Sequence, residues 1–128
     1  MRDYQSEKNN QWHLPKYLYR QTLALIRDYS RLKEEYVDTI EETHAPEGEG
    51  KTNLPGDPTG ALACRLDSMH VRISAVEKAM DEIPKEYMQG VWGNIVYAKR
   101  YPDDAGARTY GRWKARFIWL VAYHMKWI

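Results

Sequence analysis

The chain has 128 residues, which fits a single domain with one modest core and excludes an enzyme built from several parts. Its formal net charge is +1, but residues 1–83 carry 11 basic and 15 acidic side chains (net −4), whereas residues 84–128 carry 8 and 3 (net +5). This asymmetry is typical of a polyanion-binding end joined to a more acidic body.

Residues 1–15 are polar and end at Pro15, and they predict a mobile or loosely docked N-terminal arm. After Pro15, apolar positions spaced by four and three predict one long amphipathic helix; they are Leu18, Thr22, Leu25, Tyr29, Leu32, Tyr36 and Ile40. The stretch 41–60 is rich in proline and glycine and predicts a flexible loop.

A second helix is predicted from Asp57-Pro58-Thr59 onward. Its apolar residues repeat by four and three without a miss, at Leu62, Leu66, Met69, Ile73, Val76, Met80 and Ile83. Two facing stripes of this kind favour an antiparallel helical hairpin over residues 16–83. Self-association through the same apolar seam is the competing use of the pattern.

Pro84 ends that helix and can begin the next, whose apolar positions Tyr87, Val91 and Ile95 share one face. Gly90 and Gly93 weaken a short helix, so they indicate a closely approaching neighbour. A turn over residues 101–107 then leads to the final helix. No strand signal has comparable strength, so we expect an all-α protein: a long antiparallel helical hairpin followed by a C-terminal helix-turn-helix-like pair over residues 84–128.

The final helix combines an apolar face with a basic one. At about 100° per residue, one direction collects Tyr110, Trp113, Phe117, Leu120, Val121 and His124. Arg108, Arg112 and Arg116 follow one another at i, i+4 and i+8 on the other side. After Phe117 the helix is apolar almost all round, which predicts that its second half is an anchor and its first half presents charge.

A helix-turn-helix that reads DNA needs this arrangement, because base-reading side chains lie toward the N-terminus of its second helix. Arginine is the commonest specific partner of guanine. Thr109 is placed to cap the helix or to contact a phosphate. The alternative is that the three arginines only solubilise a surface helix.

Several segments of the sequence resemble a known family. The tail TYGRWKARFIWLVAYHM is the most specific of them, within the stretch from Ala75 to the end, and LIRDYSRLKEEY and GDPTG add to it. Together they resemble the phage and prophage late transcriptional regulators of the RinA and ArpU kind. The resemblance implies a C-terminal helix-turn-helix similar to sigma-factor region four. It also implies that the protein activates phage late or packaging genes. It also implies that a recognition helix opens with Arg108, Thr109, Tyr110, Arg112 and Trp113.

The chain departs from that family before the final helix. A full helix normally precedes the recognition helix directly, whereas here only Tyr101–Ala107 occupies that space. Either Tyr87–Lys99 is the first helix of the motif, with an enlarged turn, or the motif is degenerate and grips something other than DNA.

Other functional classes find little support in the sequence. The four histidines and Cys64 have no metal-ligand spacing, no acidic pair lies in an apolar pattern, and no phosphate-binding loop is present. We therefore expect neither catalysis nor a metal nor a cofactor. The N-terminal sequence lacks the apolar segment of a signal peptide and the longest apolar run is too short to span a bilayer, so we expect a cytoplasmic location, in the host cell if a phage encodes the protein.

The leading interpretation is a sequence-specific transcriptional regulator that binds double-stranded DNA. Arg108, Thr109, Tyr110, Arg112 and Arg116 would contact the duplex, while Lys99, Arg100 and Lys114 would steer toward phosphates. A dimer is favoured, because one recognition helix rarely gives useful specificity. A second interpretation is a module that binds RNA polymerase or another phage protein through the basic, aromatic tail. A third is a structural oligomer such as a DNA-packaging adaptor.

Overall fold

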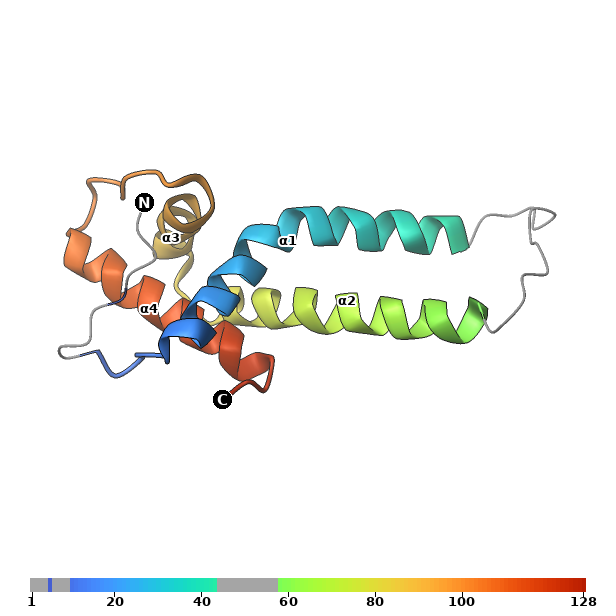
Figure 1. The fold of residues 1–128 in the computed structure, drawn as a ribbon. Coiled ribbons are helices and arrows are strands. Elements are labelled where there is room, and N and C mark those ends of the chain that lie inside the picture. The colour runs from blue at the N-terminus through green and yellow to red at the C-terminus, as the bar shows by residue number, and fades with distance from the viewer. Residues whose placement is uncertain (1–4, 6–9, 44–57) are drawn as a thin grey trace.

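The computed structural model describes Gln5, residues 10–43 and residues 58–128, and everything below concerns these residues. Within them the chain is all-helical, as predicted, with the order α1 (Lys16–Thr43), α2 (Pro58–Asp81), α3 (Lys85–Tyr97) and α4 (Ala107–His124). Figure 1 shows α3, α4 and the beginning of α1 gathered at one end of the molecule, where the C-terminus also lies. Of the described residues, only those of α1 and α2 lie at the other end.

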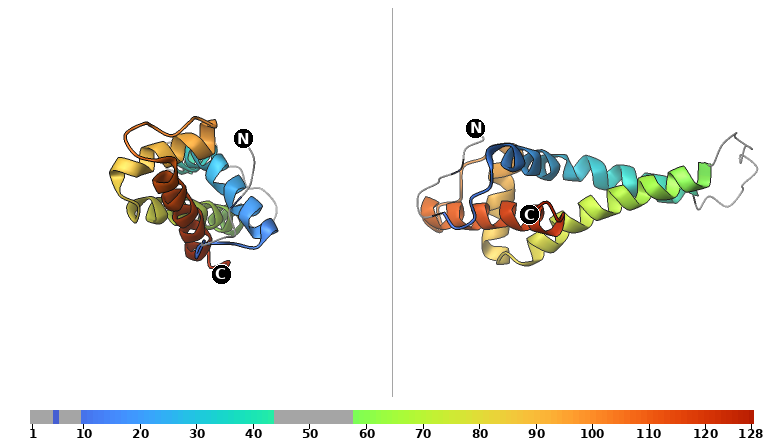
Figure 2. Two further views of the ribbon diagram at one scale, coloured as in Figure 1. Left: turned by 90° about the vertical axis from the view of Figure 1, so that its left-hand side faces the viewer. Right: turned by 60° about the horizontal axis from the view of Figure 1, so that its bottom comes forward.

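Helices α1 and α2 run antiparallel along each other (Figures 1 and 2). Residues farther along α1 contact residues earlier in α2, as antiparallel packing requires. The Tyr29 hydroxyl donates to Glu77 at 2.5 Å, Lys33 pairs with the same carboxylate, and the Tyr36 ring lies 6.0 Å from that of His70. These polar contacts line the rim of the apolar seam.

Helix α1 extends beyond the predicted stripe, whereas α2 begins at Pro58, where the Asp57-Pro58-Thr59 start signal predicts it. The loop was expected to occupy 41–60, but residues 41–43 continue α1 and residues 58–60 begin α2. Helical hydrogen bonding persists in α1 because its first proline or glycine comes only after Thr43, and proline is tolerated in the first turn of α2. The remainder of the predicted loop, residues 44–57, lies outside the described residues.

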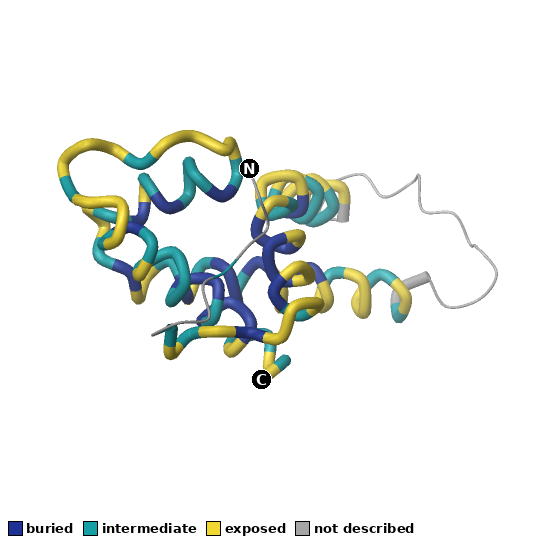
Figure 3. Tube along the Cα trace, turned by 60° about the vertical axis from the view of Figure 1, so that its left-hand side comes forward, coloured by how far each residue is buried: buried dark blue, intermediate teal, exposed yellow. Residues whose placement is uncertain are grey.

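The core sits where all four helices meet (Figure 3). Met69, Ile73, Val76 and Ile83 of the predicted α2 stripe are buried, whereas Leu62 and Leu66, toward the far end of the hairpin, are half-buried. Helix α1 is buried on more than its predicted stripe, because α2, α3 and α4 all pack against it. The additional buried residues are Tyr19, Leu23 and Ile26.

Gly90 marks the closest approach of α3 to its neighbours. A Cβ atom there would lie 2.6 Å from Cε1 of Tyr110 and 2.8 Å from Cδ of Pro102, so no larger residue fits without a shift. At Gly93 the nearest side-chain atom would be 3.7 Å away, on Lys99, which is ordinary contact. The expectation of a close neighbour is therefore confirmed for Gly90 and wrong for Gly93.

The described part of the N-terminal arm is docked, contrary to the prediction of a mobile or loosely held segment. Leu14 is 1 % exposed, and the Gln5 amide group both donates to its carbonyl and accepts from its N–H, the latter at 3.1 Å. The Trp12 ring packs edge-on against Trp119 of α4, with ring centres 5.1 Å apart. The polar composition of the arm does not predict this docking, because only two apolar residues within the segment are enough to anchor the arm.

Candidate nucleic-acid interface

The first turns of α4 present two exposed arginines. Arg108 and Arg112 lie one turn apart, and neither forms an ion pair or hydrogen bond with any described residue. The helix begins after Gly106, whose backbone is extended (φ −70°, ψ 153°). Because glycine has no side chain, it provides no side-chain cap. A helix N-terminus carries partial positive charge from its unpaired N–H groups, which adds to that of the two guanidinium groups. This end of α4 is thus suited to an anionic partner.

Thr109 does not cap α4, contrary to prediction. Gly106 occupies the N-cap position, and its carbonyl accepts hydrogen bonds from the backbone N–H groups of Thr109 and Tyr110 at 3.0 and 3.2 Å. Thr109 instead lies half-buried inside the first turn, beside Arg112. A phosphate contact from its hydroxyl stays a prediction.

Tyr110 lies in the core and faces no external ligand, which corrects its assignment to the DNA contacts. It is fully buried, with its ring stacked on Tyr101 at 5.1 Å and edge-on to Tyr87 at 5.5 Å. Its hydroxyl donates to Asp104 at 2.7 Å, and this hydrogen bond raises the pKa of Tyr110 to about 12. The residue joins α3, α4 and the segment between them, as expected for a member of the inward face.

Arg116 is partly covered by Trp12 of the N-terminal arm. Its guanidinium group lies over the rings of Trp12 and Trp113, 5.4 and 5.7 Å from their centres. The side chain is half-buried, and its Nε atom is buried without a hydrogen-bond partner. The prediction of three exposed arginines therefore holds for Arg108 and Arg112 and is wrong for Arg116. The angle of Arg116 around α4 correctly predicts that it lies outside the inward face. The arm that covers it comes from the other end of the sequence.

The remaining basic residues lie on the α3 side of α4. Lys114 donates to the Asn94 side chain at 2.9 Å, and Asn94 in turn donates to the carbonyl of Lys99 at 2.9 Å. Lys99 and Arg100 themselves are exposed, and the Lys99 ammonium lies 5.6 Å from the centre of the Tyr97 ring. Lys114 is two residues from Arg112, a rotation of about 200° around a helix, so the basic groups flank α4 on two sides.

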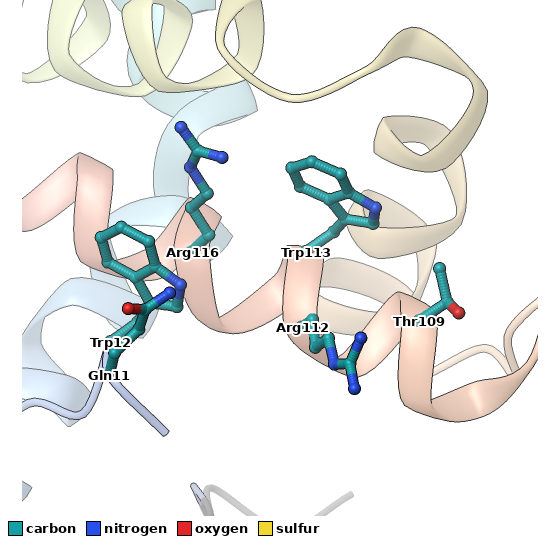
Figure 4. A pocket seen from close by; sticks show the side chains of 6 residues that line it. All are labelled: Gln11, Trp12, Thr109, Arg112, Trp113 and Arg116. Carbon is teal, nitrogen blue, oxygen red and sulfur yellow. The ribbon is translucent and has the colours of Figure 1, made fainter. Parts of the chain in front are cut away.

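A small open pocket lies beside the exposed Arg112 and the half-buried Arg116 (Figure 4). Its volume is about 230 Å³, and both α4 and the arm line it. The lining residues are Gln11, Trp12, Thr109, Arg112, Trp113 and Arg116. Sequence reasoning misses Gln11 and Trp12, because no periodicity in the arm signals a partner about a hundred residues away.

The described part of the chain contains neither a metal-ligand cluster nor a membrane-spanning helix. No group of three or more histidine, cysteine, aspartate or glutamate side chains there is arranged to hold a metal ion. Among the same residues, no helix combines the length and apolar character needed to cross a membrane.

Comparison with known proteins gives no assignment. No family model, no curated protein and no solved structure matches this chain.

Proposed function

We propose that the protein is a sequence-specific DNA-binding transcriptional regulator that inserts the first turns of α4 into the major groove of a DNA duplex. The observation that carries the proposal is the exposure of Arg108 and Arg112 at the N-terminal end of a helix, with no carboxylate partner among the described residues. Arginine there can bind O6 and N7 of a guanine together.

The surroundings of α4 support the same use. Helix α3 packs against α4, and the long segment between them, residues 98–106, agrees with the interpretation of α3 as the first helix of a motif with an enlarged turn. A recognition helix in the major groove has a phosphate strand on each side. We expect one strand to be contacted by cations on the side of α4 away from Arg112, namely the exposed Lys99 and Arg100 and the Lys114 ammonium. We expect the Thr109 hydroxyl group to contact the other strand.

The resemblance to phage late regulators narrows the proposal to late or packaging genes of a phage or prophage. In this proposal the protein acts on the duplex as a dimer, since two-fold symmetry doubles the contacted site. The site of action is then the cytoplasm of the host bacterium.

Two single substitutions test the proposal by contrast. Arg112→Ala should weaken binding to the cognate site by about 1–3 kcal/mol and relax the base preference at one position, because it removes a base contact. Lys99→Ala should weaken binding to all sequences alike, because a phosphate contact carries no sequence information. The measurement is the affinity of each variant for the cognate fragment and for a scrambled fragment. Equal losses on both fragments for Arg112→Ala would contradict base reading.

A second candidate function is the binding of a protein such as RNA polymerase. The observation in its favour is the exposed aromatic surface near the C-terminal end of α4, where the Tyr123 ring is 52 % exposed and stacks on Trp119 with centres 5.4 Å apart. Aromatic and arginine side chains are enriched at protein interfaces. Arg112→Ala would then leave binding to any duplex unchanged, whereas Tyr123→Ala would weaken capture of the purified polymerase.

A further inference from the structure

Helix α1 carries an exposed stripe along its whole length, which we call the outer stripe. It lies roughly 180° around the helix from Tyr36, whose ring faces His70 of α2. Figure 1 shows no other described helix beside this side of the second half of α1. The members follow one another at intervals of four and three, and all are exposed; they are Lys16, Arg20, Ala24, Arg27, Arg31, Glu34, Asp38 and Glu41.

The charge of the outer stripe changes sign along α1. Residues 16–27 carry three basic and no acidic side chains, whereas residues 34–42 carry five acidic and no basic ones. Between these two blocks, Arg31 pairs with Asp28 and Glu35 of the same helix at 2.7 and 2.8 Å. The stripe is therefore basic at one end, neutralised in the middle and acidic at the other end.

The outermost charges of the stripe have no counterion among the described residues. At the basic end, Lys16 and Arg20 lie over the Tyr17 ring, 5.9 and 6.0 Å from its centre, and form no ion pair. At the acidic end, Asp38 and Glu41 form no ion pair either. A matching charge for both ends must therefore come from a partner molecule.

The order of these charges does not serve the folding of α1 itself. The helix dipole favours acidic side chains in the first turn and basic ones in the last turn, and α1 has neither. Carboxylates one turn apart, such as those of the acidic end, also repel each other. The arrangement thus lowers the stability of an isolated α1, which indicates a role in association.

A second copy of the chain supplies matching charges at both ends at once. When two α1 helices pack antiparallel, the basic end of each lies beside the acidic end of the other. We propose that the outer stripe is a homodimer interface, with a two-fold axis across the middle of α1 near Ser30. The same surface is used by both copies, so the contact is closed and stops at a dimer. This dimer forms without DNA and does not depend on the proposed function.

Sedimentation of the full chain at low salt, without DNA, tests the association. Exposed ion pairs contribute little each and are screened by salt, so we expect a weak dimer. The average mass should rise with protein concentration from the 15.1 kDa of one chain toward twice that value, and should fall again when salt is added. A monomer at every concentration would show that the proposal is wrong. A mass that rises beyond a dimer would overturn the two-fold contact in favour of a head-to-tail one.

Charge reversal tests which residues make the contact. A basic-end variant (Lys16→Glu, Arg20→Glu) and an acidic-end variant (Asp38→Lys, Glu41→Lys) should each self-associate at least about tenfold more weakly than the wild type. Neither should lower the melting temperature, because each moves charge to the helix end that the dipole favours. Asp67→Lys is the matched control: Asp67 is exposed on α2, outside the stripe, so its reversal should leave association unchanged.

Combining the reversals tests the antiparallel arrangement. An equimolar mixture of the two variants should form a heterodimer, because each reversed end then faces a reversed end and each unchanged end faces an unchanged one. A chain that carries all four substitutions should dimerise like the wild type, which a parallel contact does not allow. If the folded variants dimerise as tightly as the wild type, or if the combined chain stays monomeric, the proposal is wrong. Duplex binding by a monomeric protein would leave the proposed function standing, and a dimer that binds no duplex would overturn the proposed function alone.

Discussion

Gly90 and Gly93 are separated by one turn of α3 but differ in what a side chain would meet. Gly90→Ala forces a methyl group against Tyr110 and Pro102, and overpacking of this kind lowers the free energy of unfolding by about 1–3 kcal/mol. This loss exceeds the gain of about 0.5–1 kcal/mol that comes from replacing a helical glycine. Gly93→Ala meets no such obstacle and should keep most of that gain. Urea unfolding of both variants checks the contrast. A stabilised Gly90→Ala variant would show that α3 and α4 are less tightly packed than described.

Tyr110 and Arg116 show where residue-level prediction from sequence ends. The angle around α4 correctly separates an inward from an outward face, and it places Tyr110 in the inward group. The resemblance also assigns Tyr110 to the DNA contacts, which contradicts that angle. The burial of Tyr110 shows that the residue belongs to the core. Arg116 has the outward angle, but its surroundings depend on Trp12, whose position no local pattern reveals.

At the scale of elements, Glu77 links the two helices of the hairpin through Tyr29 and Lys33. Burial raises the pKa of Glu77, but the hydrogen bonds from Lys33 and Tyr29 outweigh it and leave the pKa below its ordinary value of 4.5. The stabilisation is therefore fully present above the ordinary pKa and is lost as the pH falls through the lowered one.

Glu77→Gln should lower stability at neutral pH by about 1 kcal/mol and make the loss of stability in acid shallower. Thermal melting at a series of pH values from neutral to acidic measures both effects. Glu34→Gln serves as the control, because Glu34 is exposed on α1 and forms no ion pair with a described residue. Identical pH profiles for wild type and Glu77→Gln would exclude the link.

The hairpin is unequally buried along its length, which separates two substitutions that the sequence pattern treats as equivalent. Ile73 is 4 % exposed in the core, so Ile73→Asp should destabilise the protein by more than about 4 kcal/mol and unfold it. Leu66 is half-buried, so Leu66→Asp should cost distinctly less. Circular dichroism and the mass in solution report folding and dissociation. Equal effects would mean that the far part of the seam is as buried as the near part, for example by a second copy.

At the scale of the whole molecule, the sequence predicts the helices better than it predicts their assembly. Regular spacing of apolar residues requires only local information, so α1, α2 and α4 follow from it, with ends displaced by a few residues. The second buried face of α1, at Leu23 and Ile26, and the docking of the arm at Leu14 depend on contacts between distant segments. The two exposed arginines of the candidate site follow from helix geometry, whereas the aromatic pocket beside them does not.

The proposed function requires that exposed cations around α4 bind the DNA duplex. Its most direct test is the dependence of the duplex affinity on salt concentration. If Lys99 and Arg100 of both copies in the proposed dimer together neutralise about four phosphates, the plot of log affinity against log salt concentration should have a slope of about −3 to −4. The double substitution Lys99→Ala, Arg100→Ala should make that slope shallower and leave the melting temperature nearly unchanged, because both side chains are exposed. Absence of duplex binding at low salt by the folded wild-type protein, or a slope that the double substitution does not alter, would contradict the account.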